Sequence, residues 1–357
     1  MRRSLILLAT ATIVALIMTL AGPVAADAPE FPDFTMMEAG PEGVAVDNVG
    51  NVYVSVGDEA GQTDLWKFNP VGVGTLLTKL PGPSPAGLAV DANGKHVYAA
   101  QQFIGVFKVD MDGGVSLVPG TDAIVVPNSL AFDKKGNLYI TETYSFDADD
   151  GLAYYPFCDF TGVPDGPPFD GNFGRGGIWV VPKGGEAELL LRHDLLTGVC
   201  APVPIPFPIG ANGLAYRHGS LIVANTEKAL LLEIPVLKRG GLGDITIVAD
   251  LSGIEIDGFT FGPPMIDGIA LDVHGNIYAA MITGNAIVRV SQDSATSEVL
   301  ATDADGLTFP ASLAFGTGKG ERSSVFVTNL AFDPYPPFLA GPGLTKIDVG
   351  QPGMPLP

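Results

Sequence analysis

The sequence contains very few cysteines and few basic residues. Its 357 residues include only two Cys, with no Cys-x-x-Cys motif and no Cys/His cluster, which excludes a disulfide-dense scaffold and gives no sign of a zinc or redox site. Lys and Arg number 19 against 39 Asp and Glu, a formal net charge of −20. Because nucleic-acid binding depends on clustered Lys and Arg, this balance argues against a nucleic-acid partner.

Long helical patterns are also missing. The 46 Gly and 30 Pro interrupt nearly every window of helical length, and the apolar residues alternate with a period of two. Glycine does not recur at every third position, and 46% of the residues are hydrophobic, so neither collagen nor a disordered chain fits. The sequence therefore predicts an all-β protein that is rich in turns.

A single apolar run approaches the length of a membrane span. It extends from Leu5 to about Leu20, follows two arginines and ends before Gly22-Pro23 and several small residues. This pattern is typical of a secretory signal peptide with cleavage after Ala26 or Ala28. A transmembrane anchor is the alternative, but the run is short for a span of roughly 20 residues.

We therefore expect residues 1–26 to be removed and residues 27–357 to form one secreted or periplasmic domain without a membrane span. The paired arginines Arg2 and Arg3 raise twin-arginine export as a second route. General secretion is favoured because the hydrophobic core is strong and no Ser precedes the arginines. No Cys follows the cleavage site, which argues against a lipid anchor.

A short phrase recurs six times along the rest of the chain. Each copy leads into a turn and a second alternating run, such as NVYVSV, and the two together are typical of a β-hairpin. The copies begin at Pro41, Pro85, Pro127, Ala211, Ile266 and Pro310 and read PEGVAVD, PAGLAVD, PNSLAFD, ANGLAYR, IDGIALD and PASLAFG.

Two further strand-like runs follow each hairpin, which gives a unit of four antiparallel strands. Six units of about 40 to 50 residues predict a six-bladed β-propeller around a central channel. One interval is longer and holds no further copy of the phrase, so residues 143–176 are interpreted as an insertion between the second and third strands of blade 3. The last blade has only three strands after Pro310, and Phe34 to Glu38 is expected to supply the fourth and close the ring.

The second residue of the phrase indicates a metal site. In a propeller the six equivalent residues converge on the channel axis at one rim. Asn and Asp are common in the turn before a strand for local backbone reasons, but Glu is not, so turns alone do not explain this set. Two carboxylates and two amides, without His or Cys, suit a hard cation with about 6–8 oxygen ligands, which favours one Ca²⁺ over Mg²⁺. The six residues are Glu42, Ala86, Asn128, Asn212, Asp267 and Ala311.

These phrases resemble the senescence-marker-protein/gluconolactonase family, six-bladed propellers that include sugar lactonases, luciferin-regenerating-enzyme-like proteins and diisopropyl fluorophosphatase. The resemblance covers the whole chain after the signal peptide. In that family a Glu, two Asn and an Asp bind the catalytic calcium, and Glu42, Asn128, Asn212 and Asp267 match them in order and blade. The resemblance implies that Ca²⁺ polarises a carbonyl or phosphoryl oxygen while Asp267 acts as general base or nucleophile.

Two positions depart from the family pattern. Sugar lactonases carry an Arg that holds substrate hydroxyls where this chain has Val126, and many relatives have an Asp where it has Ser129. The first departure argues against a sugar specificity, and the second against an additional structural calcium.

Long loops around blades 3 and 4 are expected on the rim of the metal site. Cys158 and Cys200 lie in these loops, and in an exported protein we expect them to form a disulfide, with two buried thiols as the alternative. The loops are rich in aromatic residues and Pro, which favours an apolar or aromatic substrate unless the aromatic rings only pack their own loops. Candidate substrate contacts near the ends of second strands are Glu142, Tyr144, Asn225 and Asn329.

The leading hypothesis is a calcium-dependent hydrolase of a small-molecule lactone or related ester. A closed propeller buries its own edges, so a monomer is expected. The main alternative is a non-catalytic propeller of the NHL-repeat type that binds a ligand or a protein on the same rim. A condensing enzyme similar to strictosidine synthase is a third hypothesis.

Overall fold

The structure is a computed structural model that describes residues 40–58, 60–82, 85–145, 174–200, 207–238, 240–294, 296–331 and 341–356. The predicted signal peptide at 1–26, the expected closing strand at 34–38 and Cys158 lie outside these residues. None of the helices in the described part of the chain is long and apolar enough to cross a membrane.

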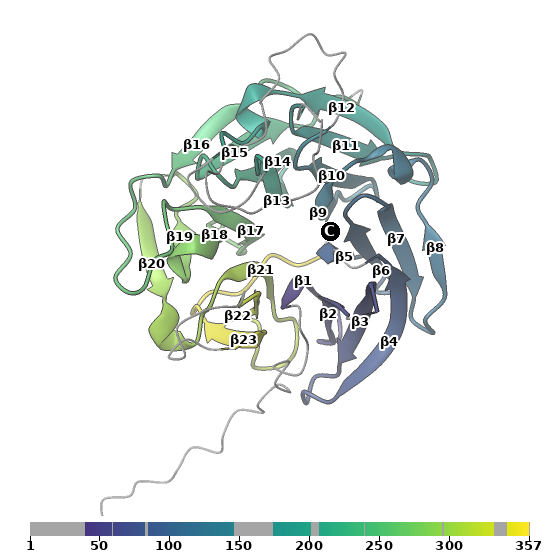
Figure 1. The fold of residues 1–357 in the computed structure, drawn as a ribbon, viewed down its shortest axis with the longest axis horizontal. Helices are drawn as coiled ribbons and strands as arrows, with labels where there is room; N and C mark the ends of the chain where they lie inside the picture. The colour runs from purple at the N-terminus through teal and green to yellow at the C-terminus, as the bar shows by residue number, and fades with distance from the viewer. Residues whose placement is uncertain are drawn as a thin grey trace, which may run out of the picture. The chain divides into compact units, whose positions relative to one another are not determined.

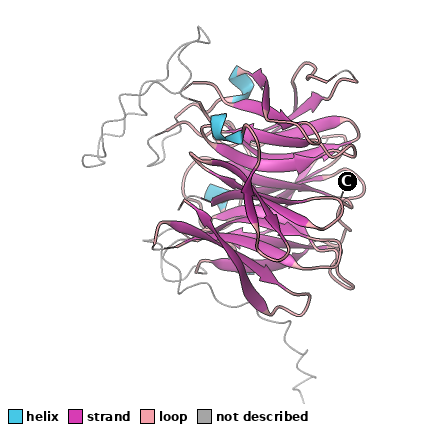
Figure 2. Ribbon diagram, turned by 90° about the vertical axis from the view of Figure 1, so that its right-hand side faces the viewer, coloured by secondary structure: helices cyan, strands magenta, loops and turns pink. Residues whose placement is uncertain are grey.

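The described chain forms six antiparallel sheets around a central channel (Figure 1), which confirms the predicted all-β six-bladed propeller. Figure 2, turned by 90°, shows that strands and loops make up nearly all of the described chain. Short 3-10 helices occupy Thr121–Ala123, Asp194–Leu196, Ile282–Gly284 and Asp303–Asp305. The strands are, in blade 1, β1 (Pro41–Val46), β2 (Val52–Gly57), β3 (Gln62–Phe68) and β4 (Gly74–Pro81); in blade 2, β5 (Pro85–Val90), β6 (His96–Gln101), β7 (Gly105–Asp110) and β8 (Val115–Leu117); in blade 3, β9 (Pro127–Phe132), β10 (Leu138–Glu142), β11 (Gly177–Val181) and β12 (Glu188–Arg192); in blade 4, β13 (Ala211–Arg217), β14 (Ser220–Asn225), β15 (Leu230–Pro235) and β16 (Thr246–Asp250); in blade 5, β17 (Ile266–Leu271), β18 (Ile277–Met281), β19 (Ala286–Val290) and β20 (Ser297–Ala301); and in blade 6, β21 (Pro310–Phe315), β22 (Ser324–Asn329) and β23 (Gly343–Asp348).

The core of the propeller lies between neighbouring blades. The second strands are buried on both faces in β2 and β18, and β6 leaves only His96 and Tyr98 partly exposed, whereas the outermost strands β4 and β8 are largely exposed. One cluster packs residues of β14 and β15 against β17, β18 and β19. Apolar residues on both faces of the inner strands therefore hold the ring of blades together.

The last part of the repeated phrase forms the turn between the first and second strands. The Asp47 carboxylate accepts hydrogen bonds from the backbone amides of Val49 and Asn51 and from the Asn51 side chain. Gly50 has a φ of 89°, a conformation that favours glycine. The same arrangement recurs at Asp133 and Asp272. The recurrent Asp and Gly-Asn thus fix the hairpins, and we call this end of the channel the turn rim.

Blade 6 has three strands among the described residues, and it packs directly against blade 1. The Thr328 hydroxyl donates to the backbone oxygen of Glu42 over 2.6 Å, and Phe326 lies in a cluster with residues of β1 and β2. In blade 3, β10 and β11 are hydrogen-bonded neighbours, although residues 143–176 separate them in the sequence. A bridge between Ser145 and Gly174 holds the two ends of this connection together.

A segment near the end of the sequence lies in the channel at the turn rim, where the sequence analysis predicted nothing. The Met354 amide donates to Leu271 over 2.8 Å, and the Val273 amide donates to Pro352 over 3.0 Å. Met354 packs on the cluster of blades 4 and 5, whereas Leu356 packs on that of blades 1 and 2. The segment runs to the centre of the ring in Figure 1. Together with the first strands, residues 352–356 line a cavity of about 600 Å³.

Candidate functional site

A β-bulge places the second residue of each phrase at the start of its first strand. In blade 1, Pro41 pairs with Val56 and Val44 pairs with Val54, so that Glu42 and its neighbour oppose a single residue. The same shift occurs in the other five blades. A bulge changes the direction in which side chains point. The side chains at these six positions therefore do not follow the alternation of the regular strands. We call this end of the channel the site rim.

Backbones of neighbouring blades approach closely at the bulges. A Cβ on Gly213 would stand 2.5 Å from the backbone oxygen of Asp267, and a Cβ on Gly43 would stand 2.3 Å from that of Ala86. A larger residue at either place would have to displace the backbone of the next blade. The third residue of the phrase is Gly in four of the six blades, where it allows adjacent site residues to lie close together, and Ser129 and Ser312 take this place in blades 3 and 6.

In three of the six blades, a side-chain hydroxyl connects the bulge to the next blade. Thr141 accepts a hydrogen bond from the Ser129 amide over 2.9 Å and donates to the backbone oxygen of Asn212 over 2.7 Å. Thr328 and Ser55 make the equivalent bonds to the backbone oxygens of Glu42 and Ala86. These hydroxyls were not among the residues predicted from the sequence. The signal for them was a hydroxyl where the other three blades have Ala100, Ala224 and Ala280.

The two site carboxylates lie close enough to interact. Burial, followed by the negative charge of Glu42, raises the pKa of Asp267 well above its usual range, and a hydrogen bond from the Asn212 side chain opposes this shift. Burial also raises the pKa of Glu42 to about 7. Asp267 is 6% exposed and Asn212 is 5% exposed. The structure thus brings together Glu42, Asn212 and Asp267 from blades 1, 4 and 5.

Asn128, in blade 3, is held by a neighbouring threonine. Its amide nitrogen donates to Thr143 over 3.1 Å, and the Thr143 hydroxyl donates to the backbone oxygen of Ala211 over 3.1 Å. Asn128 is 6% exposed, and its amide oxygen accepts no hydrogen bond within the described ranges. This arrangement leaves the oxygen available as a ligand.

These residues fit a hard cation. They offer carboxylate and amide oxygens in a buried place, and a positive charge would relieve the repulsion between Glu42 and Asp267. The described residues contain no group of three or more His, Cys, Asp or Glu placed to hold a metal. Amide oxygens would therefore have to complete the ligand set, which suits calcium better than zinc or copper.

The candidate substrate contact Glu142 is completely buried and paired. Its carboxylate accepts hydrogen bonds from the Val125 amide over 3.0 Å and from the Trp179 indole over 2.8 Å, and it forms an ion pair with Arg192 over 2.8 Å. Burial raises the pKa of Glu142, and the charge of Arg192 opposes that shift. These contacts hold a loop and an outer strand of blade 3.

Asn225 and Asn329 are also buried, and each is bonded to the loop that leads into its blade from the blade before. The Asn225 amide donates to the backbone oxygens of Leu195 and Thr197 over 2.9 and 3.0 Å. Asn329 donates to the backbone oxygen of Gly306 over 3.0 Å and accepts from the Thr308 amide over 3.0 Å. These bonds favour a role in positioning the loops over the expected contact with substrate.

Tyr144 belongs to an apolar cluster near the site rim. Its ring centroid lies 5.5 Å from that of Phe207, and both pack with Val125 and Val126. Tyr144 is 3% exposed, and burial raises its pKa to about 12. Val126, which stands where sugar lactonases have an Arg, is thus part of a buried apolar cluster.

Cys200 lies in the rim loop before blade 4. Its backbone amide donates to the Glu227 carboxylate over 2.8 Å. Because Cys158 lies outside the described residues, the Cys158–Cys200 disulfide stays a prediction.

Comparison with known proteins identifies similar folds. No protein-family model and no curated protein sequence matches the chain. Among solved structures, it is similar to regucalcin, a calcium-binding protein from Agrobacterium tumefaciens, with a TM-score of 0.61, 17% identity, and coverage of 90% of this chain and 93% of that one. It is also similar to a luciferin-regenerating enzyme, with a TM-score of 0.61, 15% identity, and coverage of 89% and 94%. A gluconolactonase from Xanthomonas campestris gives a TM-score of 0.58 at 17% identity and covers 92% and 95%.

These similarities establish the fold. The chain spans nearly the full length of each of these propellers. The role of each site residue has to be argued from the chain's own geometry.

Proposed function

We propose that the protein is an exported, calcium-dependent hydrolase of a lactone or a related ester, with its active site at the site rim. The observation that carries the proposal is the pair Glu42 and Asp267, in which Asp267 is buried and Glu42 is partly exposed, with the Asn212 side chain beside Asp267. Two carboxylates that repel each other in a buried place need a proton or a cation between them. Similarity of fold to regucalcin and a gluconolactonase supports the same conclusion.

In this proposal Glu42, Asn128, Asn212 and Asp267 hold the metal. When bound, calcium supplies a Lewis acid that polarises the carbonyl oxygen of the substrate. Asp267 acts on the substrate as general base toward water or as nucleophile, and the Asn212 amide orients its carboxylate. Thr141 fixes the backbone of Asn212, and Thr328 fixes that of Glu42.

The surroundings favour an apolar or aromatic substrate. Val126, Tyr144 and Phe207 form one apolar cluster. Phe261 and Phe309 stack edge to face with ring centroids 5.5 Å apart, and Phe261 is 38% exposed. Apolar side chains bind the body of a hydrophobic lactone better than the hydroxyls of a sugar acid.

The test measures turnover and metal binding on the same samples. The purified protein is assayed against aliphatic lactones, sugar lactones and aryl esters, with EGTA and after calcium is restored. We expect turnover that EGTA removes and calcium restores. Asp267→Asn is expected to lower kcat/KM by about a hundredfold or more, since general bases contribute roughly 10²–10⁴-fold. Asn212→Ala is expected to weaken calcium binding as well.

A matched variant distinguishes the loss of a carboxylate at the site from the loss of a negative charge elsewhere on the protein. Asp112→Asn makes the same exchange on an exposed turn and should leave turnover unchanged. Calcium bound without chelator-sensitive turnover would favour the non-catalytic propeller. A protein that binds no calcium at neutral pH would contradict the metal site.

A further inference from the structure

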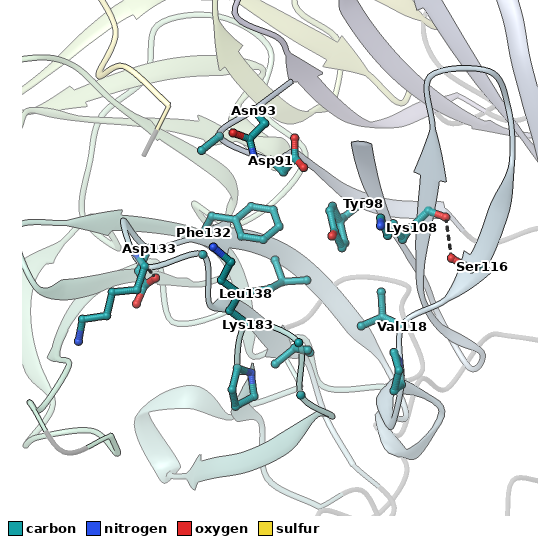
Figure 3. A pocket seen from close by; sticks show the side chains of 18 of the residues that line it. Asp91, Asn93, Tyr98, Lys108, Ser116, Val118, Phe132, Asp133, Leu138 and Lys183 are labelled. Carbon is teal, nitrogen blue, oxygen red and sulfur yellow. Dashed lines mark hydrogen bonds between the residues drawn. The ribbon is translucent and has the colours of Figure 1, made fainter. Parts of the chain in front are cut away.

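A second cavity lies between blades 2 and 3 on the side of the turn rim. It has a volume of about 570 Å³ and is bounded by β8, by the turns after β5 and β9, and by the turn between β11 and β12 (Figure 3). Its size falls within the range of about 300–1,000 Å³ that is typical of small-molecule sites. Neither the candidate metal ligands nor the apolar cluster around Tyr144 lines it.

Positive charge gathers around this cavity in a strongly acidic protein. Four of the eleven lysines in the sequence line it, namely Lys108, Lys134, Lys135 and Lys183. Two carboxylates, Asp91 and Asp133, line it as well, so the lining carries 4 − 2 = +2 against −20 for the whole chain. The four lysines make no salt bridge with any described residue. The positive charge of the lining would therefore attract an anion, whereas the rest of this acidic protein would repel it.

The two carboxylates are engaged by their own turns. Asp91 accepts from the Lys95 amide over 2.8 Å and lies 2.7 Å from the His96 ring nitrogen. Asp133 accepts from the backbone amides of Lys135 and Asn137 over 2.8 and 2.9 Å. Their acceptor atoms hold the turns, which leaves the lysine ammonium groups for a ligand.

The inner wall of the cavity is apolar and aromatic. Tyr98 and Phe132 stack edge to face, with centroids 5.0 Å apart and an interplanar angle of 76°. Val118 and Leu138 line the cavity beside them, and both are buried. Such a wall favours a ligand with an aromatic ring over a bare inorganic anion.

Two of the lysines lie on either side of the aromatic pair. Figure 3 shows the end of Lys183 beside Phe132 and the side chain of Lys108 beside Tyr98. The Lys183 stem lies over Gly136, because a Cβ at that glycine would stand 3.4 Å from its Cδ atom. The Lys183 amide donates to the Asn137 side chain over 3.1 Å. Lys183 is thus held at the cavity by its backbone and by its stem.

We propose that this cavity binds a small aromatic anion, a carboxylate or a sulfonate. The ring lies against Tyr98 and Phe132, and the anionic group lies between Lys108 and Lys183. The proposal is independent of the hydrolase site, which shares none of these residues.

The test uses 8-anilinonaphthalene-1-sulfonate as the anionic aromatic probe and N-phenyl-1-naphthylamine as its uncharged counterpart. Fluorescence titration of the purified protein at low salt is expected to show saturable binding of the sulfonate and much weaker binding of the amine. The double variant Lys108→Ala/Lys183→Ala should weaken sulfonate binding about tenfold or more, since each exposed charge pair contributes up to about fivefold. Lys183→Arg keeps the charge and should bind within about threefold of the wild type.

Controls separate the cavity from the rest of the surface. Lys238→Ala removes an exposed lysine elsewhere and should leave sulfonate binding unchanged. Asp267→Asn should also leave it unchanged, which keeps the outcome separate from that of the hydrolase assay. Equal affinity for both probes, or unchanged sulfonate affinity in the double variant with a native melting curve, would overturn the proposal.

Discussion

At the scale of single residues, Glu42 and Asp267 decide how the protein responds to pH. In the folded, metal-free protein the pKa of Glu42 is raised from 4.5 to about 7. Between these two values the folded state holds a proton that the unfolded state has lost. Folding stability therefore falls as pH rises through this range and stays low above it.

We predict this fall in EGTA, where no calcium compensates the charge. A shift from 4.5 to about 7 corresponds to a loss of about 3 kcal/mol between pH 4.5 and 7. Thermal unfolding at pH 5 to 8 measures it, and Glu42→Gln should make the dependence less steep, while Asp267, whose pKa burial also raises, keeps a part of it. Calcium should raise Tm more at pH 8 than at pH 5, because protons compete with the metal for the carboxylates. The same slope in Glu42→Gln and wild type would contradict this assignment.

The sequence singles out these residues as candidates but does not predict their surroundings. Glu42, Asn128, Asn212 and Asp267 could be listed because a sixfold repeat makes equivalent positions visible in one chain. The interaction between Asn212 and Asp267 could not be predicted, since it depends on how closely two blades approach. That distance is set by packing between strands that are far apart in the sequence.

At the scale of elements, the bulges with their hydroxyl bridges support the site. Thr141 is fully buried and satisfies two backbone groups of neighbouring blades. We predict that Thr141→Val lowers the free energy of unfolding by about 1–3 kcal/mol, because it leaves buried backbone groups unpaired. It should also weaken calcium binding through Asn212. Denaturant unfolding and calcium titration measure the two effects.

Thr75→Val is a suitable control because Thr75 lies on the exposed outer strand β4, with a single hydroxyl bond of 3.4 Å. It should change stability by less than about 0.5 kcal/mol. Equal effects of the two substitutions would show that the bulge hydroxyl has no special role.

The ends of the second strands show what a sequence pattern leaves undetermined at this scale. Glu142, Asn225 and Asn329 were candidates for contact with substrate, with exposure to solvent as the alternative, because the propeller pattern brings them to the site rim. The pattern fixes the rim on which a strand ends, whereas the direction of a side chain depends on the loops around it. Those loops place unpaired backbone groups beside these residues, and the side chains satisfy them.

The two rim loops that contain Cys158 and Cys200 allow a separate prediction. If the loops are joined as proposed, the protein purified from an oxidising compartment should show no titratable thiol under denaturing, non-reducing conditions. After reduction it should show two. The matched variant Cys200→Ser should show one thiol without reduction, that of Cys158. Two thiols in the unreduced wild type would rule out the disulfide.

At the scale of the whole molecule, the fold was predictable because it is a repeat. Six phrases, their spacing and the period-two alternation predicted six blades, and the sheets confirm them. The segment at 352–356 was not predictable, because it belongs to no repeat and has no strand pattern. It lies at the turn rim because the small and apolar residues of six first strands leave a cavity there.

This segment gives a prediction about access to the channel. Met354 packs on the cluster between blades 4 and 5, and its amide bonds to Leu271. Met354→Asp should lower the free energy of unfolding by about 1–3 kcal/mol, since it places a charge against apolar residues. Met354→Leu keeps the apolar volume and should cost less than about 1.5 kcal/mol.

Turnover distinguishes anchoring of the segment from a role in catalysis. If substrate enters from the site rim, Met354→Asp should retain the kcat/KM of the wild type at temperatures where it stays folded. Its effect should then be confined to Tm, because the segment lies at the other end of the channel from Glu42 and Asp267. A loss of kcat/KM without a loss of stability would mean that the channel connects the two rims and that the segment shapes the site.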